Sequence, residues 1–136
     1  MKTPIQIAAF IKRHWPACRL TPRDILVSWV EWYVNDGRCG VVLFRGKIIG
    51  VGLVRLLEEK KQQVNEYAHF EGGEIAWIEL VVCKQRRAMQ ALWGLMLGRC
   101  KGVTQVGWKR RKYTARMRLL PLESVSPKLL GGAYGW

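Results

Sequence analysis

The chain has 136 residues, of which 23 are Lys or Arg and 10 are Asp or Glu, so its formal net charge is +13. Its 49% hydrophobic content excludes a disordered or collagen-like chain, and its length predicts a single domain over residues 1–136. No apolar run approaches the roughly 20 residues that a membrane-spanning helix needs. Lys12 and Arg13 interrupt the N-terminal segment too early for a signal peptide, so we expect a soluble, cytoplasmic protein.

The positive charge is concentrated in the C-terminal part of the chain. Residues 1–82 contain 11 basic and 9 acidic residues, a net charge of +2. Residues 83–136 contain 12 basic residues and a single acidic one, Glu123, a net charge of +11. Such segregation favours an anionic partner, which could be nucleic acid, a phosphate-bearing cofactor or an acidic protein surface.

The cysteines form no pattern typical of a metal site. The chain contains four of them: Cys18, Cys39, Cys83 and Cys100. No two are spaced as C-x-x-C, and the only histidines are the isolated His14 and His69, so we expect no metal. We interpret all four cysteines as free thiols in a reducing compartment, mostly buried, with a reactive thiol as the alternative.

Two helices are predicted at the N-terminus. Thr3, Pro4 and Gln6 form a capping signal, which predicts a helix to about His14. Its expected apolar stripe is short: Ile5, Ala8, Ala9 and Lys12. The capping signal recurs at 21–24 (TPRD) and predicts a second helix that ends at 35–37 (NDG). The apolar face of that helix is Leu26, Trp29, Val30 and Tyr33.

Three strands follow in the sequence. Cys39–Phe44 and Ile48–Leu57 are apolar and β-branched, and the short segment 45–47 between them predicts a tight antiparallel hairpin. Gly50 and Gly52 indicate a bulge, or a place where another backbone or a ligand comes close. The polar segment 58–73 predicts a loop or a frayed hairpin end. Glu74–Cys83 is apolar enough to be a central strand.

The remainder of the chain predicts one helix and two strands. Gln85–Arg99 has the clearest helical pattern, with its stripe at Ala88, Ala91, Leu92, Leu95 and Met96. Val103–Trp108 predicts a fourth strand, and Tyr113–Leu122 predicts a fifth. The third strand, this helix and the fourth strand form a βαβ-type unit. The expected class is therefore α+β, with a mixed, mostly antiparallel sheet and helices on its faces.

The segment 75–97 (IAWIELVVCKQRRAMQALWGLML) resembles the core of the GNAT superfamily, the acetyl-CoA-dependent N-acyltransferases. In that family a strand is followed by an Arg/Gln-x-x-Gly-x-Gly/Ala loop that begins a long amphipathic helix. Backbone amides at such a helix start bind the coenzyme pyrophosphate. The motif itself covers 79–92, and the order of elements matches over about 1–122 in outline.

The resemblance implies roles for particular residues. Glu79 would deprotonate the acceptor amine, and Tyr113 would return a proton to the thiolate. The splayed end of the strand, which pairs with the pantetheine arm, would be Leu80, Val81 and Val82. The phosphate loop would be Arg86, Arg87, Ala88, Met89, Gln90 and Ala91. The simpler alternatives are a solvent-facing Glu79, a solvated arginine pair and an aromatic side chain on an edge strand.

The loop departs from the family pattern, because Met89 or Gln90 occupies the place of its first glycine. Two functions therefore stay open: transfer of an acetyl group from acetyl-CoA to an amine, or a non-catalytic basic module. Small GNAT-like proteins poor in loop glycines occur among bacteriophage-encoded and virion-associated proteins, so the resemblance also suggests a location in the host cytoplasm or a virion.

A second cluster of positive charge lies near the C-terminus. Six cations fall within ten residues: Lys109, Arg110, Arg111, Lys112, Arg116 and Arg118. Trp108 and Tyr113 lie among them, so the segment combines charges for phosphates with rings for stacking on bases. It predicts binding of nucleic acid or another polyanion, and an acidic protein partner or the coenzyme phosphates are the alternatives.

Overall fold

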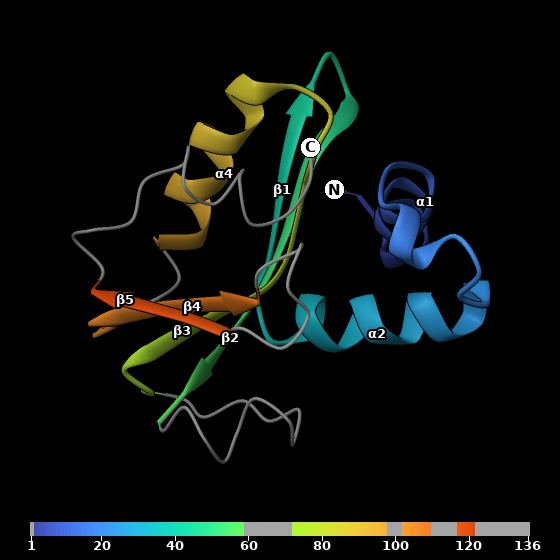
Figure 1. The fold of residues 1–136 in the computed structure, drawn as a ribbon. Coiled ribbons are helices and arrows are strands. Elements are labelled where there is room, and N and C mark those ends of the chain that lie inside the picture. Colours follow the sequence, from blue (N-terminus) through green and yellow to red (C-terminus); the bar gives the residue numbers. More distant parts are fainter. Residues whose placement is uncertain (1, 59–71, 98–101, 110–116, 122–136) are drawn as a thin grey trace.

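The computed structural model describes residues 2–58, 72–97, 102–109 and 117–121 (Figure 1). Within these ranges lie three α-helices, a 3-10 helix and five strands, and the α-helices and strands follow one another in the order that the sequence predicts. Their bounds are α1 Pro4–His14, η1 Pro16–Cys18, α2 Arg23–Asn35, β1 Cys39–Phe44, β2 Lys47–Leu57, β3 Ile75–Cys83, α4 Arg86–Leu97, β4 Gln105–Lys109 and β5 Met117–Pro121. None of the helices described is long and apolar enough to cross a membrane.

Helix α1 begins with the predicted capping box. The Gln6 amide donates to the Thr3 hydroxyl at 3.3 Å, and the Thr3 amide donates to Gln6 Oε1 at 2.9 Å. The predicted apolar stripe is confirmed at Ala8 but wrong at Ile5, which is 49% exposed, and at Ala9, which is exposed. The residues that α1 buries are Ile7, Ala8, Phe10 and Ile11. The larger side chains of this second stripe remove more apolar area from water, which decides the orientation of the helix.

Helix α2 begins one residue later than its capping signal predicts. Pro22 takes the N-cap position, and no side chain caps the helix there. The predicted inner face is confirmed for Leu26, Val30 and Tyr33, which are buried, whereas Trp29 is only partly buried. Trp29 and Trp32 pack edge-on against the Tyr33 ring, with centroids 5.9 and 4.8 Å away.

The five strands form one sheet in the order β1-β2-β3-β4-β5. Neighbouring strands are antiparallel except β3 and β4, which are parallel and are joined through α4. The α+β class, the mixed sheet, the central third strand and the βαβ unit are thus confirmed. The strand predicted over 113–122 is described for Met117–Pro121, and its first residues lie outside the described part.

The hairpin between β1 and β2 turns over Arg45 and Gly46. Both residues have positive φ, 52° and 76°, as the favoured two-residue hairpin turn requires. The predicted explanations for Gly50 and Gly52 both apply. The β1–β2 register shifts directly after the Val42–Gly50 pair, which marks a bulge next to Gly50, and a Cβ on Gly52 would lie 2.6 Å from Met96 Sδ of α4.

The helices cover both faces of the sheet (Figure 1). Helices α1 and α2 pack on one face, against a cluster that includes Val51, Leu53 and Leu80. Helix α4 packs on the other face, where its buried residues are Ala88, Met89, Leu92 and Met96. Ala91 and Leu95 of the predicted stripe are exposed instead, because the tightest contacts of α4 with the sheet are made through Leu92 and Met96 at Gly40 and Gly52.

Candidate functional site

Strands β3 and β4 pair only at their first residues. The register joins Ile75 to Gln105 and ends at Trp77 and Gly107, although β3 continues to Cys83 on its other edge, paired with β2. Among the described residues, β3 therefore has a neighbour on the β4 side for three residues only. The predicted splayed segment, Leu80–Val82, lies beyond this last pair, with its side chains buried. The two strands thus diverge beside the end of β3 that leads into α4.

A β-bulge interrupts β3 where it diverges from β4. In the β2–β3 register Leu53 faces Leu80, but the next residue, Val54, faces Ile78. Glu79 is therefore the extra residue of the bulge and has no Cα partner on β2. The side chain of Glu79 is 23% exposed, whereas its neighbours in the strand are almost fully buried. The bulge thus presents the predicted catalytic carboxylate partly to solvent within an apolar strand.

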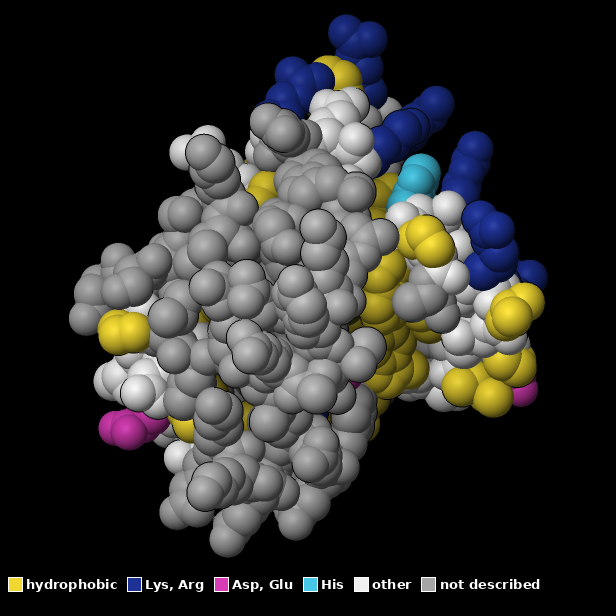
Figure 2. All heavy atoms as spheres, viewed as in Figure 1, with side chains coloured by type: hydrophobic (Ala, Val, Ile, Leu, Met, Phe, Trp, Pro, Cys, Tyr) yellow, Lys and Arg dark blue, Asp and Glu magenta, His cyan; other side chains and the backbone are white. Residues whose placement is uncertain are grey.

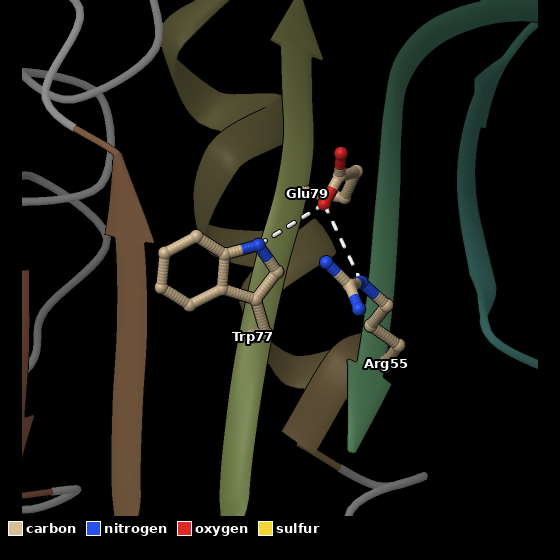
Figure 3. A network of polar contacts seen from close by, with 3 residues as sticks. All are labelled: Arg55, Trp77 and Glu79. Atoms are coloured by element: carbon tan, nitrogen blue, oxygen red, sulfur yellow. Dashed lines mark hydrogen bonds and ion pairs between the residues drawn. The ribbon is translucent and has the colours of Figure 1, made fainter. Parts of the chain in front are cut away.

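Two buried side chains hold the Glu79 carboxylate (Figure 3). The Trp77 indole Nε1 donates to Glu79 Oε2 at 3.0 Å. The Arg55 Nε of β2 lies 3.5 Å from the same oxygen, and its side chain is only 1% exposed. Both contacts use Oε2, and in Figure 3 the other carboxylate oxygen points away from both partners. Glu79 is therefore fixed by one oxygen and keeps the other for a further partner.

Arg55 and Trp77 are the site residues that sequence reasoning missed. Arg55 is the only charged residue in the apolar strand predicted over Ile48–Leu57, and a lone charge in such a strand is a signal for a buried pair. Nothing in the sequence identifies its partner, because the register of two strands and the position of a bulge depend on tertiary packing.

The predicted phosphate loop forms the first turns of α4. The Arg87 Nε donates to Gln85 Oε1 at 2.8 Å, and its guanidinium lies 4.9 Å from the centre of the Phe44 ring. Arg45 lies over the same ring at 5.2 Å. Ala88 donates its amide to the Gln85 carbonyl at 3.0 Å, so this amide is already bonded.

The other residues of the predicted loop divide between the core and the surface. Ala88 and Met89 are buried on the face of α4 that packs against the sheet, whereas Gln90 and Ala91 are exposed. The side chain of Met89, which occupies the place of a family glycine, belongs to the core cluster and does not cover the outer face of the helix start. The side chain of Arg86 lies outside the described part of the structure.

Several predicted site residues also lie outside the described part: Arg110, Arg111, Lys112, Tyr113 and Arg116. The structure places only the backbone of Lys109 and Arg118, which face Met117 and Trp108 across the β4–β5 pair. The predicted proton donor Tyr113 and the predicted polyanion surface therefore stay predictions.

Trp108 lies at the first position of β4 beyond the last β3–β4 pair. Its side chain is fully buried in the cluster under α4, and its Nε1 has no hydrogen-bond partner among the residues that the structure describes. A buried N–H without an acceptor destabilises the folded state by roughly 1–3 kcal/mol.

The described cysteines are free thiols, as predicted, and their environment disfavours reactivity. Burial raises the pKa of the Cys83 thiol to about 12, and burial also raises the pKa of Cys18 above its ordinary value. Both side chains are therefore protonated near neutral pH, whereas the thiolate is the reactive form. In the residues that the structure describes, no three His, Cys, Asp or Glu side chains gather as a metal site would need.

Solved structures similar to this chain share a GNAT-like fold. One is the GphF GNAT-like decarboxylase in complex with isobutyryl-CoA, at 16% identity and a TM-score of 0.55, aligned over 81% of this chain and 63% of that one. Another is the loading GNATL domain of CurA from Lyngbya majuscula, at 14% identity and a TM-score of 0.56, aligned over 83% and 65%. The chain therefore spans less than two thirds of either structure.

No protein-family model matches the chain, and no curated protein matches it in sequence. At these identities the similarity shows the fold, and the chain has a GNAT-like fold. The resemblance that segment 75–97 carries is confirmed at that level.

Proposed function

We propose that the chain binds an acyl-CoA, with the pantetheine arm lying along the backbone of Leu80–Val82 where β3 diverges from β4. The observation that carries this proposal is the end of the β3–β4 pairing at Trp77 and Gly107, directly before the bulge. Pantetheine contains two amides, which can bond to a strand edge as another strand would. The similar decarboxylase was solved in complex with isobutyryl-CoA, which supports a ligand of this class.

The start of α4 would bind the coenzyme phosphates. A helix start attracts anions through its free amides and its dipole, and Arg86 and Arg87 add two positive charges there. Arg87 is held beside this turn by Gln85 and the Phe44 ring. Because the side chain of Met89 is buried, the outer surface of the turn belongs to Arg87, Gln90 and Ala91.

The reaction we propose is transfer of the acyl group, acetyl in the simplest case, to an amine. The amine nitrogen attacks the thioester carbonyl carbon, the C–N bond forms and the C–S bond breaks. Glu79 takes the proton that the amine loses, directly or through a water molecule, with the oxygen that Trp77 and Arg55 leave free. The departing thiolate takes a proton from Tyr113 or from solvent.

Calorimetry with acetyl-CoA, isobutyryl-CoA and free CoA tests the binding step. We expect micromolar affinity for an acyl-CoA and a loss of about tenfold or more in the Arg86→Glu, Arg87→Glu double variant, because it reverses two charges at the phosphate site. The matched control is Lys2→Glu, Arg23→Glu, which makes the same charge change elsewhere. Absence of binding at about 1 mM coenzyme would overturn the proposal.

The chemical step is tested by release of CoA from acetyl-CoA in the presence of a panel of amines. Glu79→Gln keeps an oxygen that accepts from Trp77 but removes the base, so we expect turnover to fall about 100-fold or more while coenzyme affinity changes little. Equal turnover in the variant would show that Glu79 is not the base.

A second candidate function is a non-catalytic basic module that binds nucleic acid or another polyanion, as a virion-associated protein could. The observation that favours it is the +11 charge of residues 83–136, which exceeds what a coenzyme requires. Binding to single-stranded DNA should then weaken steeply with salt and fall when Lys109–Lys112 are neutralised. An affinity that does not change with salt would exclude this function.

A further inference from the structure

A groove lies between α1 and α2, apart from the residues assigned to the coenzyme. Its volume is about 600 Å³, and seven residues line it: Ala8, Ala9, Lys12, Arg13, Arg19, Arg23 and Leu26. It belongs to the outer surface of the helix pair, because Ala9, Arg13, Arg19 and Arg23 are all exposed. None of these residues has a part in the proposed acyl-CoA chemistry.

The rim of the groove is positively charged. Four of its seven lining residues are Lys or Arg, and none is acidic. The Lys12 Nζ donates to the Thr21 carbonyl at 3.0 Å, which holds this cation between the two helices. Arg13 also contributes, after burial, to lowering the pKa of the neighbouring His14, as a local excess of positive charge would. The groove therefore attracts an anionic partner.

The floor of the groove is apolar and is formed mainly by small side chains. Ala8, Ala9 and Leu26 line it, and since Ala9 is exposed while Ala8 and Leu26 are almost fully buried, another backbone can approach α1 closely at Ala9. Leu20, which lies in the sequence between the rim residues Arg19 and Arg23, is 93% exposed. A large apolar side chain that is almost fully exposed and lies among cations adds apolar area for a partner to cover.

We propose that the groove between α1 and α2 binds an acidic, amphipathic segment of another protein. Carboxylates of such a segment would pair with Arg13, Arg19 and Arg23, and its apolar side chains would cover Leu20 and the alanine floor. A nucleic acid would satisfy the cations but would leave this apolar surface in water. An amphipathic helix with acidic flanks uses both features, which is the helix-in-groove mode of peptide recognition.

The surface of the protein agrees with this charge complementarity. In Figure 2 the Lys and Arg side chains of the described residues gather over α1 and the β1–β2 hairpin, with apolar side chains exposed beside those of α1. Acidic side chains stand out at two lower edges of this view, one of them on the same lobe as α1 and α2. An acidic partner approaching the groove thus meets four lining cations, and Asp24, next to Arg23 in the first turn of α2, is the neighbouring carboxylate.

The test is fluorescence anisotropy of the full-length protein with a labelled helical peptide, built from Glu and Leu with the leucines on one face. We expect a micromolar Kd, weakened about tenfold by Arg19→Glu, Arg23→Glu and severalfold by Leu20→Ser. The matched control is Arg45→Glu, Lys47→Glu, which makes the same charge change at the hairpin turn and should alter the Kd less than about twofold. Circular dichroism of each variant verifies its folding.

Two further probes separate the alternatives. The same peptide with Ser in place of Leu should bind about tenfold more weakly, because it cannot cover the apolar floor. Single-stranded DNA of equal charge should be insensitive to Leu20→Ser. Equal losses in the two double variants, or DNA binding as tight as peptide binding through Arg19 and Arg23, would overturn the proposal. Absence of peptide binding at about 0.1 mM would overturn it as well.

Discussion

The two halves of strand β3 have the same apolar character but different surroundings. Residues 75–77 pair with β2 on one side and with β4 on the other, as an interior strand does. Beyond Trp77 the strand keeps its pairing with β2, while the described pairing with β4 has ended. The bulge, Glu79 and the proposed pantetheine segment all lie in this second half.

This difference shows how a sheet can contain a binding site without losing its core. The first half is held by hydrogen bonds on both edges, and the second half by one edge and by side chains buried on both faces. Apart from Glu79 both halves are apolar, so apolar composition indicates burial and does not indicate pairing. Variants that disturb one half at a time test this division.

The largest effect is expected at the start of the first half. A Cβ on Gly73 would lie 2.6 Å from the Leu57 carbonyl oxygen and 2.8 Å from its carbon, and backbone atoms cannot move aside as a side chain can. We expect Gly73→Ala to lower the free energy of unfolding by about 2–3 kcal/mol, measured by urea denaturation.

The matched control for this variant is Gly94→Ala in α4. Gly94 is exposed, and a Cβ there would meet nothing within 4 Å. The same chemical change should therefore raise the free energy of unfolding by up to about 1 kcal/mol through helix propensity. Equal effects of the two variants would show that the backbone contact at Gly73 does not constrain the strand.

A smaller effect is expected from two tryptophans that lie on either side of the divergence. Trp77→Phe removes an N–H that donates to Glu79 at 3.0 Å, whereas Trp108→Phe removes an N–H that has no acceptor in the described part of the chain. Both variants lose similar buried volume, so their difference isolates the hydrogen bond. Trp77→Phe should cost about 1–2 kcal/mol more than Trp108→Phe in urea denaturation. A larger cost for Trp108→Phe would contradict this account.

Trp108→Phe also tests the proposed ligand site. If a bound acyl-CoA supplies the missing acceptor, the variant loses coenzyme affinity without a matching loss of stability, and calorimetry measures this directly. Unchanged affinity would show that the ligand does not reach the Trp108 indole.

The smallest effect concerns the far end of the second half, where Lys84 follows β3. Burial lowers the pKa of His14 below 6.5, and the charges of Arg13 and Lys84 lower it further. Because the folded protein binds this proton less readily than the unfolded chain, stability is highest above pH 6.5 and decreases as the pH falls through the lowered pKa. His14→Gln should remove this part of the pH dependence of urea denaturation, and His69→Gln serves as the control. If the free energy of unfolding of His14→Gln depended on pH as steeply as that of the unchanged protein, this account of His14 would be contradicted.

Local sequence signals predicted most of the fold. The capping box at Thr3 and the turn at Arg45 and Gly46 depend on neighbouring residues, and both are observed. The orientation of α1 could not be predicted, because two apolar stripes compete on the same helix and only the surface it packs against selects one. Ala91 and Leu95 of α4 were misplaced for the same reason.

The candidate site was predictable only in part. The position of Glu79 before the turn into α4 was visible in the sequence, as part of a pattern shared with a known family. Its partner Arg55 is 24 positions earlier on another strand, and the bulge shows only as a register shift in the folded sheet. Contacts of this kind depend on which residues of two strands face each other, and the sequence of one strand does not encode that choice.

The bulge at Glu79 has a consequence for how this protein could change over time. Residues two positions apart in a regular strand point to the same face, but Ile78 faces the α4 side of the sheet and Leu80 faces the opposite side. The alternation of side chains between the two faces therefore shifts by one residue at Glu79. Deleting Glu79 would place Ile78 directly before Leu80, and because these two residues already face opposite sides, the strand would alternate regularly and Leu80 and Val82 would keep their side of the sheet. Replacing Glu79 leaves both cores in register. The position that carries the proposed chemistry is thus an extra residue of the strand that neither core needs for its register.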